Sequence, residues 1–221
     1  GIALGAAFRG MRPIPEVQFS DFLWPSVNQL VGEAARVCYG TDGKLSVPMV
    51  VRIPYGGGIR GGLFHSQNVE VLFFHTPGLK VVAPSTPYDA KGLLKSAIRD
   101  NNPVIFLEHK KTYRMVRGEV PEAEYLLPIG VADVKRAGST LTLVSYGLML
   151  HYCLEAAELV AGEGIEAEVV DLRTLKPLDK ETVLESVKKT GKLLIVHEDN
   201  MTGGVGAEVA AVVADEAIEY L

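Results

Sequence analysis

A glycine-rich stretch with one histidine is the first place in the chain where chemistry could occur. Residues Tyr55 to Gln67 read YGGGIRGGLFHSQ, with five glycines close to His65. Glycine loses the most conformational freedom on folding, so glycines gather where a positive φ is needed or where another group approaches the backbone. The stretch is therefore either a flexible surface loop or a loop that lets a bulky ligand lie against the main chain, with His65 at its mouth.

A second group of chemically useful residues lies in the run EVQFSDFLWP, from Glu16 to Pro25. Side chains alternate along a strand, so a strand that extended this far would place four of them on one face: Glu16, Gln18, Ser20 and Phe22. A carboxylate, an amide and an aromatic ring on one edge could hold a flat heterocycle that forms hydrogen bonds. The alternative, which the spacing favours, makes Phe22 and Trp24 core residues and Glu16 a solvated or paired charge.

Composition and missing motifs exclude several functions. The chain has no G-x-x-x-x-G-K-[ST], no G-x-S-x-G and no H-E-x-x-H, which argues against a P-loop NTPase, a hydrolase elbow and a zinc site. A net charge of −5 offers no basic surface for nucleic acid. No apolar run reaches the roughly 18 residues of a membrane span. Cys38 and Cys153 are far apart in apolar segments, which predicts two buried free thiols in a reducing compartment, the cytoplasm or the mitochondrial matrix.

The rest of the chain alternates strand-like and helix-like segments. This pattern predicts an α/β fold with two parallel sheets and right-handed crossovers. We expect one domain over 1–125 and a second over 126–221, with an irregular linker within 110–128. The expected strands are 14–19, 47–54, 79–85, 103–109, 140–147, 165–175 and 192–199, and the expected helices are 24–40, 86–100, 148–164, 179–191 and 206–221. In parallel sheets ligands sit at the carboxyl ends of strands, which is where the glycine loop falls.

Both ends of the sequence suggest a truncated domain pair. The chain starts without Met inside a helix-like pattern, GIALGAAF, and stops at the end of another, DEAIEYL. We therefore expect a missing part of each domain.

Five long motifs, in order, resemble one family over essentially the whole chain. They are GAAFRGMRPIPEVQFSDFLWPSVNQL, PYGGGIRGGLFHSQ, HTPGLKVVAPSTPYDAKGLLKSAIRDNNPVIFLEHK, DLRTLKPLD and SVKKTGKLLIVHED. They are similar to the beta subunit of the decarboxylating component of 2-oxo acid dehydrogenase complexes, which act on pyruvate or branched-chain 2-oxo acids. The resemblance implies a thiamine diphosphate pyrimidine-binding domain followed by a transketolase C-terminal-like domain.

The resemblance also implies cofactors and partners. Members of the family use thiamine diphosphate and Mg²⁺, form an α2β2 heterotetramer or a fused homodimer, and pass an acyl group to the lipoyl arm of an acyltransferase core. The Gly-Asp-Gly motif of diphosphate binding is absent from this chain. Mg²⁺ and the diphosphate would therefore be held mainly by an alpha partner, across an obligate interface with exposed apolar surface.

Carried over position by position, the resemblance assigns the candidate site. Phe22 would stack on the pyrimidine ring and Gln18 would line the same pocket. His65 would be the catalytic residue at the entrance, and the channel wall for the lipoyl arm would include Gly61, Gly62, Ser66 and Gln67. A K⁺ ion held mainly by backbone carbonyls would have as ligands Met49, Ala97, Asp100 and Asn102.

One departure concerns the activating acid. The family's glutamate that drives the cofactor into its reactive tautomer would precede Gly1, outside this sequence, and the resemblance makes Glu16 a framework residue instead. Two alternatives stay open: a thiamine enzyme like transketolase or deoxyxylulose-phosphate synthase, and a non-catalytic assembly subunit. The choice between pyruvate and a branched-chain 2-oxo acid also stays open. His75, His109, His151 and His197 are interpreted as structural.

Overall fold

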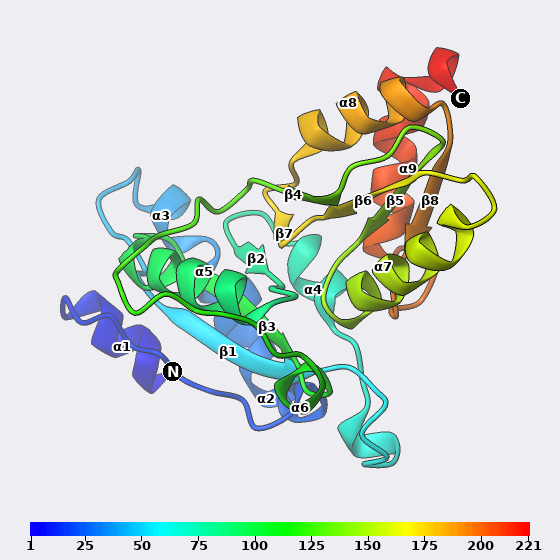
Figure 1. The fold of residues 1–221 in the computed structure, drawn as a ribbon. Coiled ribbons are helices and arrows are strands. Elements are labelled where there is room, and N and C mark those ends of the chain that lie inside the picture. Colours follow the sequence, from blue (N-terminus) through cyan, green and yellow to red (C-terminus); the bar gives the residue numbers. More distant parts are fainter.

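The protein is built around two four-stranded sheets, each covered by helices. The computed structural model describes all residues from 1 to 221, and Figure 1 shows both sheets, with β1 in cyan in the first and β8 in orange in the second. The strand orders are β1-β3-β2-β7 and β4-β6-β5-β8. No helix is long and apolar enough to cross a membrane.

The first sheet has a parallel centre. In it β1 pairs with β3 and β3 with β2, all parallel, whereas β7 runs antiparallel to β2 at the edge. Continuous apolar runs such as VIFL in β3 fit strands that are buried on both faces, and every residue of β3 is buried. The bounds are β1 Val50–Tyr55, β2 Lys80–Val82, β3 Val104–His109 and β7 Thr174–Lys176.

Helices around the first sheet begin and end at recognisable residues. The longest is α5 (Pro87–Arg99), where Pro87 opens the first turn and the Thr86 hydroxyl accepts a hydrogen bond from the Asp89 backbone amide at 3.1 Å. The predicted helix 24–40 is helical in three pieces, one of them π-helical. The remaining bounds are α1 Ile2–Phe8, α2 Trp24–Val27, the π-helix Asn28–Ala34, α3 Val37–Gly40, α4 Glu70–Phe74 and α6 Thr112–Met115.

The second sheet has the same plan as the first. Strands β6, β5 and β8 are parallel, and β4 runs antiparallel to β6 at the edge. The helix α8 starts with a cap from Asp179 to the Thr182 amide and ends at Gly191, whose φ of 68° is left-handed. The bounds are β4 Asp133–Arg136, β5 Leu141–Ser145, α7 Leu148–Ala161, β6 Ala167–Asp171, α8 Lys180–Thr190, β8 Leu193–Val196 and α9 Val205–Glu216.

The chain passes from the second sheet back to the first within the predicted strand 165–175, which corrects that prediction. The strand breaks at Leu172 and Arg173, so that β6 belongs to the second sheet and β7 to the first. Arg173 takes a φ of 54° at the break, and its carbonyl accepts from the Ala83 amide at 2.8 Å. The two predicted parallel sheets are confirmed in their three central strands, and each has in addition a short antiparallel edge strand, β7 or β4.

Two other expectations were partly wrong. The predicted strand 14–19 is extended and pairs with β1 through a single bridge between Glu16 and Arg52, but it forms no strand. The 110–128 region contains α6, and its remainder is irregular. Cys38 and Cys153 are free thiols, as predicted, and only Cys153 is buried.

Candidate active site

The glycine loop follows the carboxyl end of β1, and its backbone needs several of its glycines. Gly56, Gly58 and Gly62 have φ values of 86°, 79° and 75°, which L-residues rarely adopt. At Gly56 a Cβ atom would also lie 2.1 Å from the His109 Nε2, and at Gly61 one would lie 2.6 Å from the His65 Cβ. The base of the loop is therefore a packed structure and not a loose connection.

The loop ends in a compact turn just before α4. Leu63–His65 forms a 3₁₀ turn. The Ser66 hydroxyl donates to the Gly62 carbonyl at 2.9 Å, and the Gln67 amide donates to the Leu63 carbonyl at 3.2 Å. The predicted channel residues Gly61, Gly62, Ser66 and Gln67 thus lie on one turn, with His65 among them.

The structure brings His65 together with the second predicted group of residues. The His65 ring packs edge-on against Phe19 and Phe22, with ring centroids 4.6 Å and 5.7 Å away. The buried Ser20 hydroxyl donates to the Gln67 carbonyl at 2.8 Å, which ties the two segments to each other. Phe22 and His65, far apart in sequence, therefore form one surface.

The predicted strand that would place Ser20 and Phe22 on one face was wrong. The alternative prediction, that Phe22 and Trp24 are core residues, was also wrong. Ser20–Phe22 is a 3₁₀ turn, so side chains there do not alternate. Phe22, at the end of this turn, and Trp24, at the start of α2, are 47% and 61% exposed. Glu16 is paired, as that alternative expected, with Arg52 at 2.7 Å. Gln18 is exposed and lines a cavity beside the loop.

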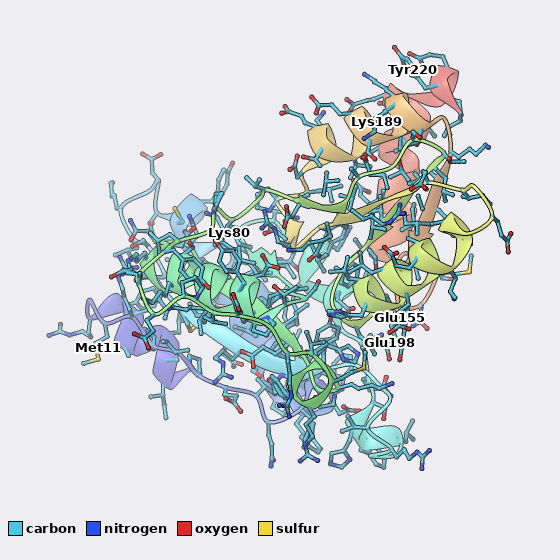
Figure 2. The ribbon with its side chains drawn as sticks, viewed as in Figure 1. Met11, Lys80, Glu155, Lys189, Glu198 and Tyr220 are labelled. Carbon is cyan, nitrogen blue, oxygen red and sulfur yellow. The ribbon has the colours of Figure 1, made fainter.

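Hydrogen bonds to Glu198 of the second domain hold the base of the loop in the first domain. Glu198 comes from the end of β8, and Figure 2 shows it where the second domain meets the first. One of its carboxylate oxygens lies 2.6 Å from the His109 Nε2, and the other accepts from the Gly57 amide at 2.8 Å. The hydrogen bond to His109, and then that to Gly57, lower the pKa of Glu198 against the opposing effect of burial. His109, interpreted as structural from the sequence, thus supports the loop.

Further acids are buried in the seam between the domains. Burial raises the pKa of Glu70 to about 8, and the nearby Asp199 adds to the shift. Burial likewise raises the pKa of Asp171 to about 7. Tyr146 donates to Glu70 at 3.3 Å, and Ser85 donates to Asp171 at 2.9 Å. Sequence reasoning missed this group, although VVD and HED carry Asp171 and Asp199 at the ends of two apolar strands, which is a signal that polar side chains meet at the carboxyl ends.

The predicted K⁺ ligands lie on the far side of the first domain. Met49 precedes β1, and its carbonyl accepts from the Val104 amide at 2.9 Å. The Asp100 carboxylate pairs with Lys80 and accepts from the Asn102 amide. The Arg12 guanidinium donates to the carbonyls of Ile98 and Asp100 at 2.9 Å and 2.8 Å. Oxygen atoms that could bind a cation lie near Ala97, but Arg12 and Lys80 already bind several of them, and the K⁺ site stays a prediction.

Comparison with known proteins identifies the family. Residues 1–116 match the model described as "Transketolase, pyrimidine binding domain", and residues 130–221 match "Transketolase, C-terminal domain". The chain is 55% identical to "2-oxoisovalerate dehydrogenase subunit beta" of Bacillus subtilis over 99% of its length and 67% of that protein's. It is 49% identical to "Pyruvate dehydrogenase E1 component subunit beta" of the same organism, with the same coverage. The chain belongs to the family of 2-oxo acid dehydrogenase beta subunits.

Two further similarities extend this result. The chain is 52% identical to "Acetoin:2,6-dichlorophenolindophenol oxidoreductase subunit beta" of Cupriavidus necator, over all of its own length and 65% of that protein's. A solved structure, "Split gene transketolase, inactive beta4 tetramer", superposes with a TM-score of 0.80 at 27% identity, covering 98% of this chain and 68% of the other. The chain thus spans about two thirds of the relatives it matches.

The exposed residues around His65 fit the ring half of thiamine diphosphate, the cofactor on which this family depends. An exposed aromatic ring at Phe22 offers a stacking surface, and the exposed Gln18 offers both hydrogen-bond donors and an acceptor. No group of three or more His, Cys, Asp or Glu side chains could hold a metal ion.

Proposed function

We propose that this chain is the beta subunit of a thiamine diphosphate-dependent enzyme that oxidatively decarboxylates a 2-oxo acid, pyruvate or a branched-chain one, and passes the acyl group to a lipoyl arm. The observation that carries the proposal is the meeting of His65 with Phe22 at the mouth of a structured glycine loop, in a chain whose relatives at 44–55% identity include beta subunits of pyruvate and 2-oxoisovalerate dehydrogenases.

The chain's own residues would bind and orient the reactive half of the cofactor. When bound, thiamine diphosphate supplies the nucleophilic carbon and stabilises the carbanion, while the protein positions it. Phe22 stacks on the aminopyrimidine ring and Gln18 lines its edge. The turn Leu63–His65 keeps this surface fixed, since Ser20 bonds it to the segment that carries Phe22.

His65 would act as the proton carrier at the entrance. Its ring is partly exposed and packs edge-on against two phenylalanines, which fixes its plane. Imidazole exchanges protons near neutral pH, so a ring nitrogen of His65 can give or take the proton that acyl transfer to the lipoyl group requires. Gly61 and Gly62 are both exposed, and Gly62, with nothing within 4 Å of its Cβ position, leaves room along the backbone for a long substituent.

A partner chain completes the site in this proposal. Four large apolar side chains around the candidate site are exposed, and patches of this kind mark interaction surfaces: Phe22, Trp24, Leu63 and Phe64, at 47%, 61%, 70% and 67%. An alpha subunit covering them would hold the diphosphate and Mg²⁺ in an α2β2 heterotetramer. The acyltransferase core would be the second partner. The named relatives come from bacteria, which supports a cytoplasmic location over the mitochondrial matrix.

The alternatives drawn from sequence have less support. Identity to the transketolase structure is 27%, against 44–55% for the dehydrogenase beta subunits. The domain division 1–125 and 126–221 stays a prediction.

Calorimetric titration of thiamine diphosphate with Mg²⁺ tests the proposal. The ligand is added first to this chain within its full-length subunit and then to that subunit mixed with its alpha partner. We expect binding only in the mixture, followed by decarboxylation of a 2-oxo acid. Tight binding to the subunit alone would contradict the split site, and a mixture that binds the cofactor without decarboxylating any 2-oxo acid would favour the non-catalytic assembly subunit.

A further inference from the structure

The loop that carries His65 is bound to the second domain near each of its two ends. At its start, the Gly57 amide donates to the Glu198 carboxylate at 2.8 Å. At its end the chain enters α4, whose first residue is Glu70, and the Glu70 carboxyl accepts from the Tyr146 hydroxyl at 3.3 Å. Tyr146 follows β5 and Glu198 follows β8, so both contacts cross the seam between the domains.

The two contacts differ in how the acid is held. Glu198 is partly exposed, and its hydrogen bond with His109 lowers its pKa, which favours the ionised form. Glu70 is 0% exposed, and its carboxyl receives hydrogen bonds only from neutral groups, which are backbone amides and the Tyr146 hydroxyl. Burying an ionised carboxylate among neutral donors costs free energy, and the group avoids this cost by taking up a proton.

A second acid acts on Glu70 from the other domain. One carboxylate oxygen of Asp199 accepts from the Asn200 amide at 2.7 Å, and the other is buried without a hydrogen-bond partner. Burial, and then the charge of Asp199, raise the pKa of Glu70 to about 8. Burial lowers the pKa of the nearby His197, so its ring is neutral at neutral pH and places no positive charge between the two acids.

The cations on the elements around α4 are bound elsewhere. The helix packs against β2 of the first sheet and α9 of the second domain (Figure 1). Lys80 on β2 pairs with Asp100, and Lys176 on β7 donates to the Phe74 carbonyl at 2.8 Å. The remaining titratable side chains on and around α4 are phenols, imidazoles and acids: Tyr55, His75, Tyr146, His197, Asp199 and Glu208. An ionised Glu70 would therefore meet a like charge and no cation.

We propose that Glu70 is a proton-dependent latch, a contact that binds the end of the His65 loop to the second domain while its carboxyl is protonated and releases α4 when it ionises beside Asp199. Glu198 keeps the start of the loop bound in both states. Glu70 is thus a positioning residue for His65, which precedes it by five residues. The inference does not rest on the proposed catalytic function, because it concerns the order of the loop and not the reaction.

Hydrogen–deuterium exchange with mass spectrometry tests the latch in the assembled full-length protein. The exchange rate of residues 66–74 is divided by that of the unfolded peptide at the same pH, which removes the intrinsic pH dependence of exchange. Between pH 6 and pH 8 we expect the protection of this segment to fall at least about tenfold. Opening releases the Glu70 proton, and one released proton changes the opening equilibrium by up to about tenfold per pH unit.

Variants assign the effect to the latch. Glu70→Gln stays neutral and can still accept from Tyr146, so the protection of residues 66–74 should be the same at both pH values. Asp199→Asn should reduce the fall, because the pKa of Glu70 moves back toward its ordinary value. Glu185→Gln, at an exposed acid on α8, is the matched control and should behave like the unchanged protein.

Infrared spectroscopy checks the proton itself. At pH 6 the difference spectrum between the unchanged protein and Glu70→Gln should contain the C=O stretch of a protonated carboxylic acid, which an ionised carboxylate lacks. A difference spectrum without that band would overturn the proposal, because the latch needs a protonated Glu70.

Two results of the exchange experiment would also overturn it. The first is an equal fall in protection in the unchanged protein and in Glu70→Gln. The second is a protection of residues 66–74 equal to that of the buried strand β3 at both pH values, which would mean that the whole fold opens and not the end of the loop. A protein without decarboxylase activity can still pass these tests, so the two proposals fail independently.

Discussion

The two sheets of this protein share one plan, yet only the first presents a candidate site at its carboxyl end. Each has three parallel strands and an antiparallel edge strand. After β1 the chain forms an exposed loop that ends in His65, whereas after β8 the chain turns back and sends Glu198 to His109 and Gly57. The second sheet therefore supports the loop of the first.

Packed and open glycines occur in the loops that follow β1 and β8. In the second domain a Cβ at Gly204 would lie 2.9 Å from the His197 Cε1, whereas Gly203 has nothing within 4 Å of its Cβ position. In the first domain Gly56 is packed against His109, but Gly62 has nothing within 4 Å of its Cβ position. The first loop is thus rigid at its base and open at its tip, which is the arrangement that a ligand channel needs.

The largest effect is expected where the two domains meet the loop. Gly56→Ala combines a strained φ with a clash against His109, and we expect it to lower the free energy of unfolding by about 3 kcal/mol. Urea unfolding measures the change. Gly62→Ala, also at a positive φ but with open space at its Cβ position, is the control and should cost only the backbone strain, about 1–2 kcal/mol. Equal losses for the two variants would mean that the base of the loop is no more rigid than its tip.

The next effect concerns catalysis at the tip of the loop. His65→Ala in the assembled enzyme should slow acyl transfer to lipoamide by roughly 10²-fold, the contribution typical of a general acid–base group, and leave cofactor binding intact. Stopped-flow kinetics measures the rate of acyl transfer, and calorimetry measures cofactor binding, so the two effects are separated. His75→Ala, on an exposed histidine after α4, is the matched control and should leave the rate unchanged. An unchanged rate in His65→Ala would remove this residue from the mechanism.

A smaller effect tests the buried acids in the seam. The folded-state pKa of Glu70 is raised to about 8, so between its ordinary pKa and pH 8 the folded state binds more protons than the unfolded state. Stability should therefore fall as pH rises through this window. Glu70→Gln should remove part of that fall and raise the free energy of unfolding at pH 8, relative to pH 5, by roughly 1–2 kcal/mol.

Urea unfolding at pH 5 and pH 8 checks this prediction. The exposed Glu185, replaced by Gln, provides the matched control and should show no change in the pH dependence. If the free energy of unfolding changes with pH as steeply in Glu70→Gln as in the unchanged protein, the Glu70 carboxyl titrates as if it were in water.

The smallest effect on stability is expected at the exposed ring of Phe22. Phe22→Ala should lower the free energy of unfolding by less than about 1 kcal/mol, since surface substitutions cost little, yet it should weaken thiamine diphosphate binding in the assembled protein. The fully buried Phe73, replaced by Ala, should cost about 3–5 kcal/mol. A loss of stability in Phe22→Ala that matched Phe73→Ala would show that Phe22 serves the core.

Prediction from sequence succeeded where local patterns are strong. Apolar runs identified β3 and β5, and the Thr86–Pro87 start and the Gly191 end marked α5 and α8. It failed where pairing partners are remote. Nothing local in DLRTLK shows that Arg173 is the point at which the chain passes from one sheet to the other.

The candidate site divides in the same way. The residue types of the site can be recognised from the sequence alone: glycines precede His65, and an aromatic ring stands at Phe22. This is possible because the spacing within a motif is a local property of the chain. Their meeting is not local: His65 reaches Phe19 and Phe22 only because the turn Ser20–Phe22 replaces a strand and Ser20 bonds to Gln67. The burial of Glu70 beside Tyr146 and the hydrogen bond of Glu198 with His109 depend on packing between segments that are 76 and 89 residues apart. Desolvation and partner geometry exist only in the folded chain, and they decide which of the polar residues are left available to a ligand.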